Sequence, residues 1–201
     1  DIINIFLLSV ITFIVLYPLY FVVIASISDP DLVNTGKVIL LPKGITFMGY
    51  VRVFQDMEIL IGYRNTIFYT VFGTMINLFL TLTSAYALSK KRLRGRNFFT
   101  FLFAFTMYFS GGLIPTYLLV KNLGMLNKIW ALVIPNAVSM YNIVVARTFF
   151  SNSVPAEIEE SAFIDGCNTT YTFVMIVLPL SKALISVLAL FYGVGHWNAF
   201  F

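Results

Sequence analysis

Three carboxylates lie close together in one polar segment of the chain, at Glu157, Glu159 and Glu160. Two carboxylates that face one glycosidic bond are the usual arrangement for cutting polysaccharides. Neighbouring helical positions point about 100° apart, so Glu159 and Glu160 do not converge on one bond. The sequence also contains no nucleophile–base set, no glycine-rich phosphate loop and no group of metal-ligating residues. We therefore predict no catalytic residue and no metal site. A membrane enzyme of polysaccharide metabolism is a weaker interpretation of these carboxylates than a non-catalytic role.

Helix signals predict how these carboxylates are positioned. Ser153 is suited to cap a helix whose first turn contains Pro155, and the glutamates then lie near the positive end of the helix dipole. A stripe of residues at three-and-four spacing follows, and it is narrow because two members are small: Ile158, Ser161, Ala162 and Asp165. A narrow helix suits insertion into a groove on another protein. An ordinary interfacial amphipathic loop is the alternative interpretation.

A turn and a second helix are predicted to follow the first. Gly166 can adopt the left-handed conformation that ends a helix. Asn168 or Thr169 can then cap a second helix, which continues past Pro179 into an apolar stretch. Residues 151–180 are therefore predicted to form a helix, a glycine turn and a second helix.

The composition indicates a membrane protein. Hydrophobic residues make up 59% of the 201 residues and charged residues 11%, and the mean hydropathy is +0.89. Soluble domains carry roughly 25% charged residues. A soluble protein of this size could not bury so much apolar surface, whereas a lipid bilayer removes that difficulty.

Five stretches are long and apolar enough to cross a bilayer, which requires about 20 mostly apolar residues. They cover residues 5–27, 65–88, 97–119, 129–150 and 181–201. The predicted fold class is therefore an all-α, polytopic transmembrane bundle that forms one domain over residues 1–201. The first stretch is too long for a signal peptide. Gly111, Gly112 and Pro115 interrupt the third stretch, either for close helix packing or a tolerated kink, or as a broken helix lining a pathway.

Basic residues predict the orientation. The block Lys90–Arg96 contains five positive charges and no acid, which favours the cytoplasmic side. Alternation of the spans then places the amino terminus and residues 151–180 inside, and residues 28–64 and 121–128 outside. A nucleic-acid-binding patch is a weak alternative because apolar spans flank the block, so no nucleic-acid partner is expected.

The segment 151–180 resembles the cytoplasmic signature of the ABC importer permeases, which has the form E-A-A, three residues, G, nine residues, I-x-L-P. The residues of this segment match the signature with its spacing intact, apart from two departures. The aspartate before the glycine is also typical of the family. Two departures are Ser161 in place of alanine and Ala183 where a proline is common. The residues that the resemblance assigns to coupling with an ATPase are Glu160, Ser161, Ala162, Asp165, Gly166, Ile176, Leu178 and Pro179.

The resemblance extends over essentially the whole chain. The runs Phe109–Asn127, Met140–Phe150 and Gly195–Phe201 look like maltose-type carbohydrate permeases, and most like those that import alginate or pectin oligosaccharides. That family has six spans, so the resemblance implies a sixth span beyond Phe201. The chain begins with Asp1, so we expect it to be part of a longer protein.

The resemblance also implies partners and a location. It implies a multi-pass protein of the bacterial inner membrane that pairs with a second, related permease. Two ATPase subunits would bind ATP and Mg, and this chain would hold no cofactor. An extracytoplasmic binding protein would deliver an oligosaccharide. The first helix of 151–180 would be a coupling helix that docks in a cleft of the ATPase, with Glu160 in polar contact and Gly166 setting the angle between the two helices.

The sugar path is less clear from the sequence. Sugar sites need amide and hydroxyl groups for hydrogen bonds and aromatic faces for the apolar side of the ring. The third to fifth predicted spans supply such groups at Tyr108, Asn136, Ser139, Asn142, Trp197 and Asn198. Each of these residues could equally serve packing or a membrane interface.

An ion-coupled secondary transporter is the alternative function. Such proteins usually place acidic residues at membrane depth, and the predicted spans have none in their central portions. His196, in the fifth predicted span, is an ionisable group at membrane depth. A single histidine there is more often a hydrogen-bonded packing residue than a proton relay.

Overall fold

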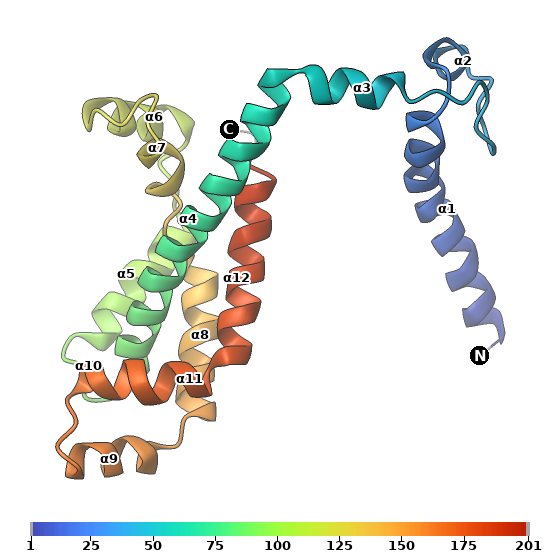
Figure 1. The fold of residues 1–201 in the computed structure, drawn as a ribbon. Coiled ribbons are helices and arrows are strands. Elements are labelled where there is room, and N and C mark those ends of the chain that lie inside the picture. Colours follow the sequence, from blue (N-terminus) through green and yellow to red (C-terminus); the bar gives the residue numbers. More distant parts are fainter. Residues whose placement is uncertain (1, 200–201) are drawn as a thin grey trace. The chain divides into compact units, whose positions relative to one another are not determined.

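The computed structural model describes residues 2–199, except for the side chain of Ala156, and all regular elements in that range are helices. The chain divides into two units, Asp1–Arg64 and Asn65–Phe201. Figure 1 shows the helices of both units. The predicted all-α class is thus confirmed for the described residues.

The first unit contains α1 (Ile2–Ser26), α2 (Pro30–Asn34) and α3 (Met48–Gln55). α1 is long and apolar enough to cross a membrane, as predicted for residues 5–27. The segment after α1 folds back on it, since the Tyr17 hydroxyl donates to the Ile39 carbonyl at 3.1 Å. Asp29 caps α2 by accepting from the backbone N–H of Asp31.

The second predicted span is one helix, α4 (Met57–Ser89), and it also has the length and apolarity to cross a membrane. Its buried residues begin at Gly73 and recur toward the end of the helix. The polar side chains of Asn77 and Thr81 are among them, with 1% and 0% exposure. α4 therefore contributes both apolar packing and buried hydrogen-bonding groups.

The third predicted span, residues 97–119, is not one continuous helix. It is divided into α5 (Arg96–Tyr108) and α6 (Leu113–Asn122), which are bent by 116°. Gly112 between them has a φ of 86°, in the region that favours glycine. Pro115 follows in the first turn of α6, where its missing N–H has no helical partner to lose. The break predicted as one alternative is therefore the structure observed.

The fourth predicted span, residues 129–150, is also interrupted, so the prediction of a continuous helix was wrong. It consists of α7 (Trp130–Val133) and α8 (Met140–Ser153) with a non-helical connection. Pro135 has no backbone N–H, so it cannot donate the hydrogen bond that a continuing helix would need. Side chains satisfy the freed backbone instead: Asn77 Nδ2 donates to the Asn136 carbonyl at 3.1 Å, and the Ser139 N–H donates to the Tyr192 hydroxyl at 3.3 Å.

The chain then forms α9 (Ala156–Ile164), α10 (Thr169–Thr172), a π-helical turn η1 (Phe173–Val177), α11 (Leu178–Leu180) and α12 (Lys182–Trp197). The segment Thr169–Leu180 meets α12 at a bend of 83° near Ser181. α12 covers most of the fifth predicted span, residues 181–201, whose last two residues lie outside the described range. By length and apolarity, the described helices provide two candidate spans, or up to four if each bent pair counts as one.

One hydrophobic core joins these helices within the second unit. Figure 1 shows α9, α10 and α11 at one end of the bundle and α6 and α7 at the other. The core draws on α4, α8, η1 and α12, so the turn η1 is packed into the bundle. Its buried members are Leu82, Ala85, Tyr86, Leu88, Ile143, Ala146, Phe150, Val154, Val177, Leu184 and Leu188.

Candidate functional site

The first helix of the segment 151–180 begins later than predicted. Ser153 is the last residue of α8, and Pro155 occupies the cap position before α9. The physical reason is Pro155, which drives the preceding Val154 into an extended conformation (φ −108°, ψ 104°) and so ends α8. The prediction that Ser153 caps this helix was therefore wrong.

The glutamates of α9 face different surroundings. Glu157 and Glu159 lie in the first turn, where the positive end of the helix dipole stabilises a carboxylate. Glu159 is buried with 9% exposure, whereas Glu157 and Glu160 are exposed. In the predicted stripe, Ala162 is buried at 4% exposure, while Ile158, Ser161 and Asp165 are exposed. α9 thus turns Glu159 and Ala162 inward and its other described side chains outward.

The predicted turn is confirmed at Gly166, whose φ is 81°. A β-carbon at this position would meet no atom within 4 Å, so the need for glycine comes from the backbone conformation alone. Asn168 provides the cap of the next helix, because its Oδ1 accepts from the Tyr171 N–H at 2.8 Å. The predicted choice between Asn168 and Thr169 is thus resolved in favour of Asn168.

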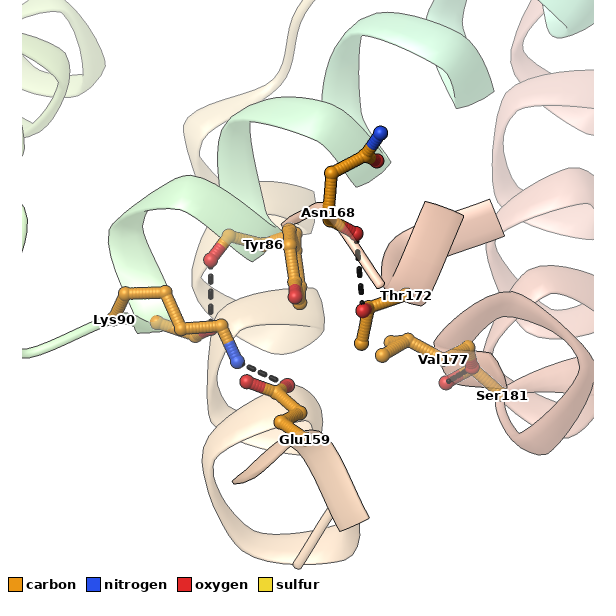
Figure 2. Close-up of polar contacts among 8 residues, drawn as sticks. Tyr86, Lys90, Glu159, Asn168, Thr172, Val177 and Ser181 are labelled. Atoms are coloured by element: carbon orange, nitrogen blue, oxygen red, sulfur yellow. Dashed lines mark hydrogen bonds and ion pairs between the residues drawn. The ribbon is translucent and has the colours of Figure 1, made fainter. Parts of the chain in front are cut away.

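The second helix of the segment changes its winding where the signature ends. Ile176 lies in the π-helical turn η1, and Leu178 and Pro179 form the start of α11. Pro179 cannot supply the N–H that a continuous α-helix would need there. Figure 2 shows Thr172 and Ser181, both fully buried, whose hydroxyls donate to the carbonyls of Asn168 and Val177 at 3.1 and 2.8 Å. Thr172 thus bonds to the carbonyl of the residue that caps α10, and Ser181 bonds to the carbonyl of the last residue of η1.

A second candidate site is a cavity of about 290 Å³ between α4, the α7–α8 connection and α12. Its size is near the lower end for small-ligand pockets. Amide, hydroxyl, imidazole and aromatic groups line it together, as a sugar requires. The lining residues include Thr66, Tyr69, Asn77, Asn136, Tyr192 and His196.

A hydrogen-bonded chain forms one wall of this cavity. Asn77 Nδ2 donates to the Asn136 carbonyl, so its Oδ1 faces His196 Nε2 at 3.1 Å. An amide oxygen only accepts, and His196 therefore carries its proton on Nε2. Gly73 makes room for the ring, because a β-carbon there would lie 2.5 Å from Nε2. This geometry agrees with the prediction that His196 is a hydrogen-bonded packing residue.

The structure brings together only part of the predicted sugar path. Asn136 lines the cavity, and Ser139 bonds through its backbone to the lining residue Tyr192. Asn142 is buried in α8, and Tyr108 is 79% exposed. Trp197 and Asn198 are exposed at the end of α12 and are not among the lining residues. Sequence reasoning missed Asn77, although an amide within an apolar span is a signal of a buried partner.

Comparisons with known proteins concern the chain as a whole. No family model matches the chain. Protein LplC of Bacillus subtilis (strain 168) is 42% identical over 201 residues, which are 100% of this chain and 68% of that protein. The polygalacturonan/rhamnogalacturonan transport system permease protein YtcP of the same organism is 42% identical over 183 residues, which are 91% of this chain and 64% of that protein.

A solved structure gives the same result in three dimensions. The crystal structure of a bacterial ABC transporter involved in the import of the acidic polysaccharide alginate matches with a TM-score of 0.95 and 39% identity. The match covers 100% of this chain and 71% of that one. The chain thus spans about two thirds of the length of these proteins. It is an integral membrane protein, and it belongs to the family of ABC sugar-transport permeases.

Proposed function

We propose that the chain is the transmembrane permease subunit of an ATP-driven importer for oligosaccharides, and that its substrates include uronate-containing ones. The observation that carries this proposal is the segment 151–180, in which the signature spacing coincides with a left-handed Gly166 between two helices. The substrate class is supported by two relatives, since one belongs to a polygalacturonan/rhamnogalacturonan system and the other to an alginate importer.

The proposed assembly follows from the family. This chain would pair with a second, related permease in the bacterial inner membrane and cross it several times, with six spans in the whole protein. Two ATPase subunits would bind ATP and Mg and hydrolyse the nucleotide, and a binding protein outside the membrane would deliver the sugar. This chain would bind no cofactor. Lys90–Arg96 and the segment 151–180 would face the cytoplasm.

In this assembly α9 is the coupling helix. Its outward side presents Glu160 together with exposed apolar side chains, of which Ile164 is 86% exposed. Such a surface is costly to leave in water and suits a cleft on an ATPase subunit. Rocking of the ATPase pair would move α9, and the bundle would alternate between inward-open and outward-open states.

The cavity near Asn77 and Asn136 is the part of the described structure best suited to a sugar. The Asn136 side chain and the Thr66 and Tyr69 hydroxyls can supply hydrogen bonds, and Phe191 supplies an aromatic face. Acidic side chains, which ion-coupled transporters use at membrane depth, are absent from its lining residues. The relatives likewise give no support to an ion-coupled mechanism.

Uptake by cells tests the proposal and its alternative together. Cells that express the full importer should accumulate labelled galacturonate or alginate oligosaccharides, and cells that lack only this subunit should not. A protonophore, with ATP held constant, should leave uptake unchanged. Uptake that stops with the proton gradient while ATP persists would instead establish the ion-coupled alternative. Uptake that continues without this subunit would reject the proposed function.

A further inference from the structure

The inward-facing side of α9 contains a charge that docking on an ATPase does not require. Glu159 forms an ion pair with Lys90, and this is the single ion pair within residues 2–199. The two side chains are 12% and 31% exposed, so water screens them less than a surface pair. Figure 2 shows them pointing toward each other, Lys90 from the end of α4 and Glu159 from α9.

Both helix ends favour this pair. Lys90 directly follows Ser89, the last residue of α4, where the helix dipole is negative. Glu159 lies in the first turn of α9, where the dipole is positive. Arg96 Nε also donates to the Leu88 carbonyl at 2.9 Å and so closes the end of α4 from the other side. The hydrogen bond from Arg96 thus holds the end of α4 in place, and with it the position of Lys90.

The contact continues from Lys90 into the core. The Lys90 ammonium lies 4.3 Å from the centroid of the Tyr86 ring, within the range of a cation–π interaction. Tyr86 is 6% exposed, and its ring packs against Phe173 and Phe150 at centroid distances of 4.6 and 5.9 Å. A displacement of Glu159 therefore acts through Lys90 on a packed group that joins α4, α8 and η1.

The two adjacent glutamates of α9 therefore differ in what they contact. Glu160 is exposed and available to a partner, whereas Glu159 is held by this chain. We propose that Glu159 and Lys90 are the positioning residues through which movement of α9 reaches α4. This inference rests on the proposed function and adds a specific path inside the permease subunit.

The test measures coupling in the reconstituted importer, with both permeases, the ATPase subunits and the binding protein. Glu159→Gln and Lys90→Gln should each lower sugar uptake per ATP hydrolysed roughly tenfold, which lies in the lower part of the usual range for coupling between sites. Co-purification of the ATPase subunits should stay within about twofold of the wild type, because Glu160 is untouched. The exchange Lys90→Glu with Glu159→Lys should restore part of the coupling, because it returns the ion pair while the helix dipoles and the Tyr86 ring disfavour the reversed charges.

A matched control comes from the basic block. Lys91→Gln changes an exposed charge of the same type next to Lys90 and should leave coupling unchanged. The inference is overturned if the paired residues behave like this control, if the charge exchange restores nothing, or if Glu159→Gln releases the ATPase. Gly166→Val in the same assay separates the two levels. Normal transport by Gly166→Val would contradict the proposed function, whereas its failure beside normal Glu159→Gln would contradict only this inference.

Discussion

At the scale of single residues, the cavity wall depends on a glycine that faces a histidine. Gly73 on α4 leaves space for the His196 ring on α12, and Asn77 one turn later binds that ring at 3.1 Å. Asn77 is 1% exposed and uses its other amide group to hold the backbone after Pro135. The close approach of α4 and α12 and the shape of the cavity thus depend on the same few atoms.

Gly73→Ala should destabilise the protein because its β-carbon would lie 2.5 Å from His196 Nε2. Moving the ring would break the bond to Asn77, and overpacking of this kind typically costs about 1–3 kcal/mol. Thermal unfolding in detergent should show a lower Tm. Gly62→Ala on the same helix, which meets nothing within 4 Å, should not lower it. A Tm for Gly73→Ala equal to that of the control would contradict the packing described here.

At the scale of elements, local signals predicted the turn in the segment 151–180 better than the spans. Gly166 and Asn168 act on their immediate neighbours, so the sequence alone was enough to predict a turn followed by a capped helix. The break after α7 was missed because hydropathy does not show that Asn77 and Tyr192, which are distant in sequence, would satisfy the freed backbone. The late start of α9 was missed because α8 continues through Ser153, and Pro155 then holds Val154 in an extended conformation.

The orientation of the elements can be tested by labelling. Lys37 and Arg94 are exposed, and the proposed topology puts them on opposite sides of the membrane. In a Cys167→Ser background, Lys37→Cys should react with an impermeant thiol reagent in intact cells, and Arg94→Cys should react only after permeabilisation. Labelling of Arg94→Cys in intact cells would contradict the cytoplasmic location of the basic block.

At the scale of the whole molecule, the proposed roles are divided between subunits: this chain would supply a path and a coupling surface, and the ATPase subunits would supply the energy. Its described side chains contain no group of three or more potential metal ligands, and its sequence has no glycine-rich phosphate loop followed by lysine. In the proposed importer, work would enter through contacts with the ATPase subunits, which is the role proposed for α9. The polar cavity and α9 lie in the same unit of the chain.

The purified subunit should accordingly hydrolyse no ATP. Activity should appear when the ATPase subunits and the second permease are added, and it should rise with the binding protein and sugar. The measurement is phosphate release by each combination, with a catalytically inactive ATPase subunit as the control for contamination. Hydrolysis by the pure subunit that survives this control would contradict the division of labour proposed here.

The central claim, that the segment 151–180 couples the bundle to an ATPase, is tested most directly by two matched glycine variants. Gly166 and Gly124 both have positive φ angles, 81° and 64°, and a β-carbon at either would meet nothing within 4 Å. Valine should impose a similar backbone strain of about 1–2 kcal/mol at each position. Sugar uptake and ATPase pull-down should both be lost in Gly166→Val and retained in Gly124→Val. Wild-type uptake by Gly166→Val would contradict the account.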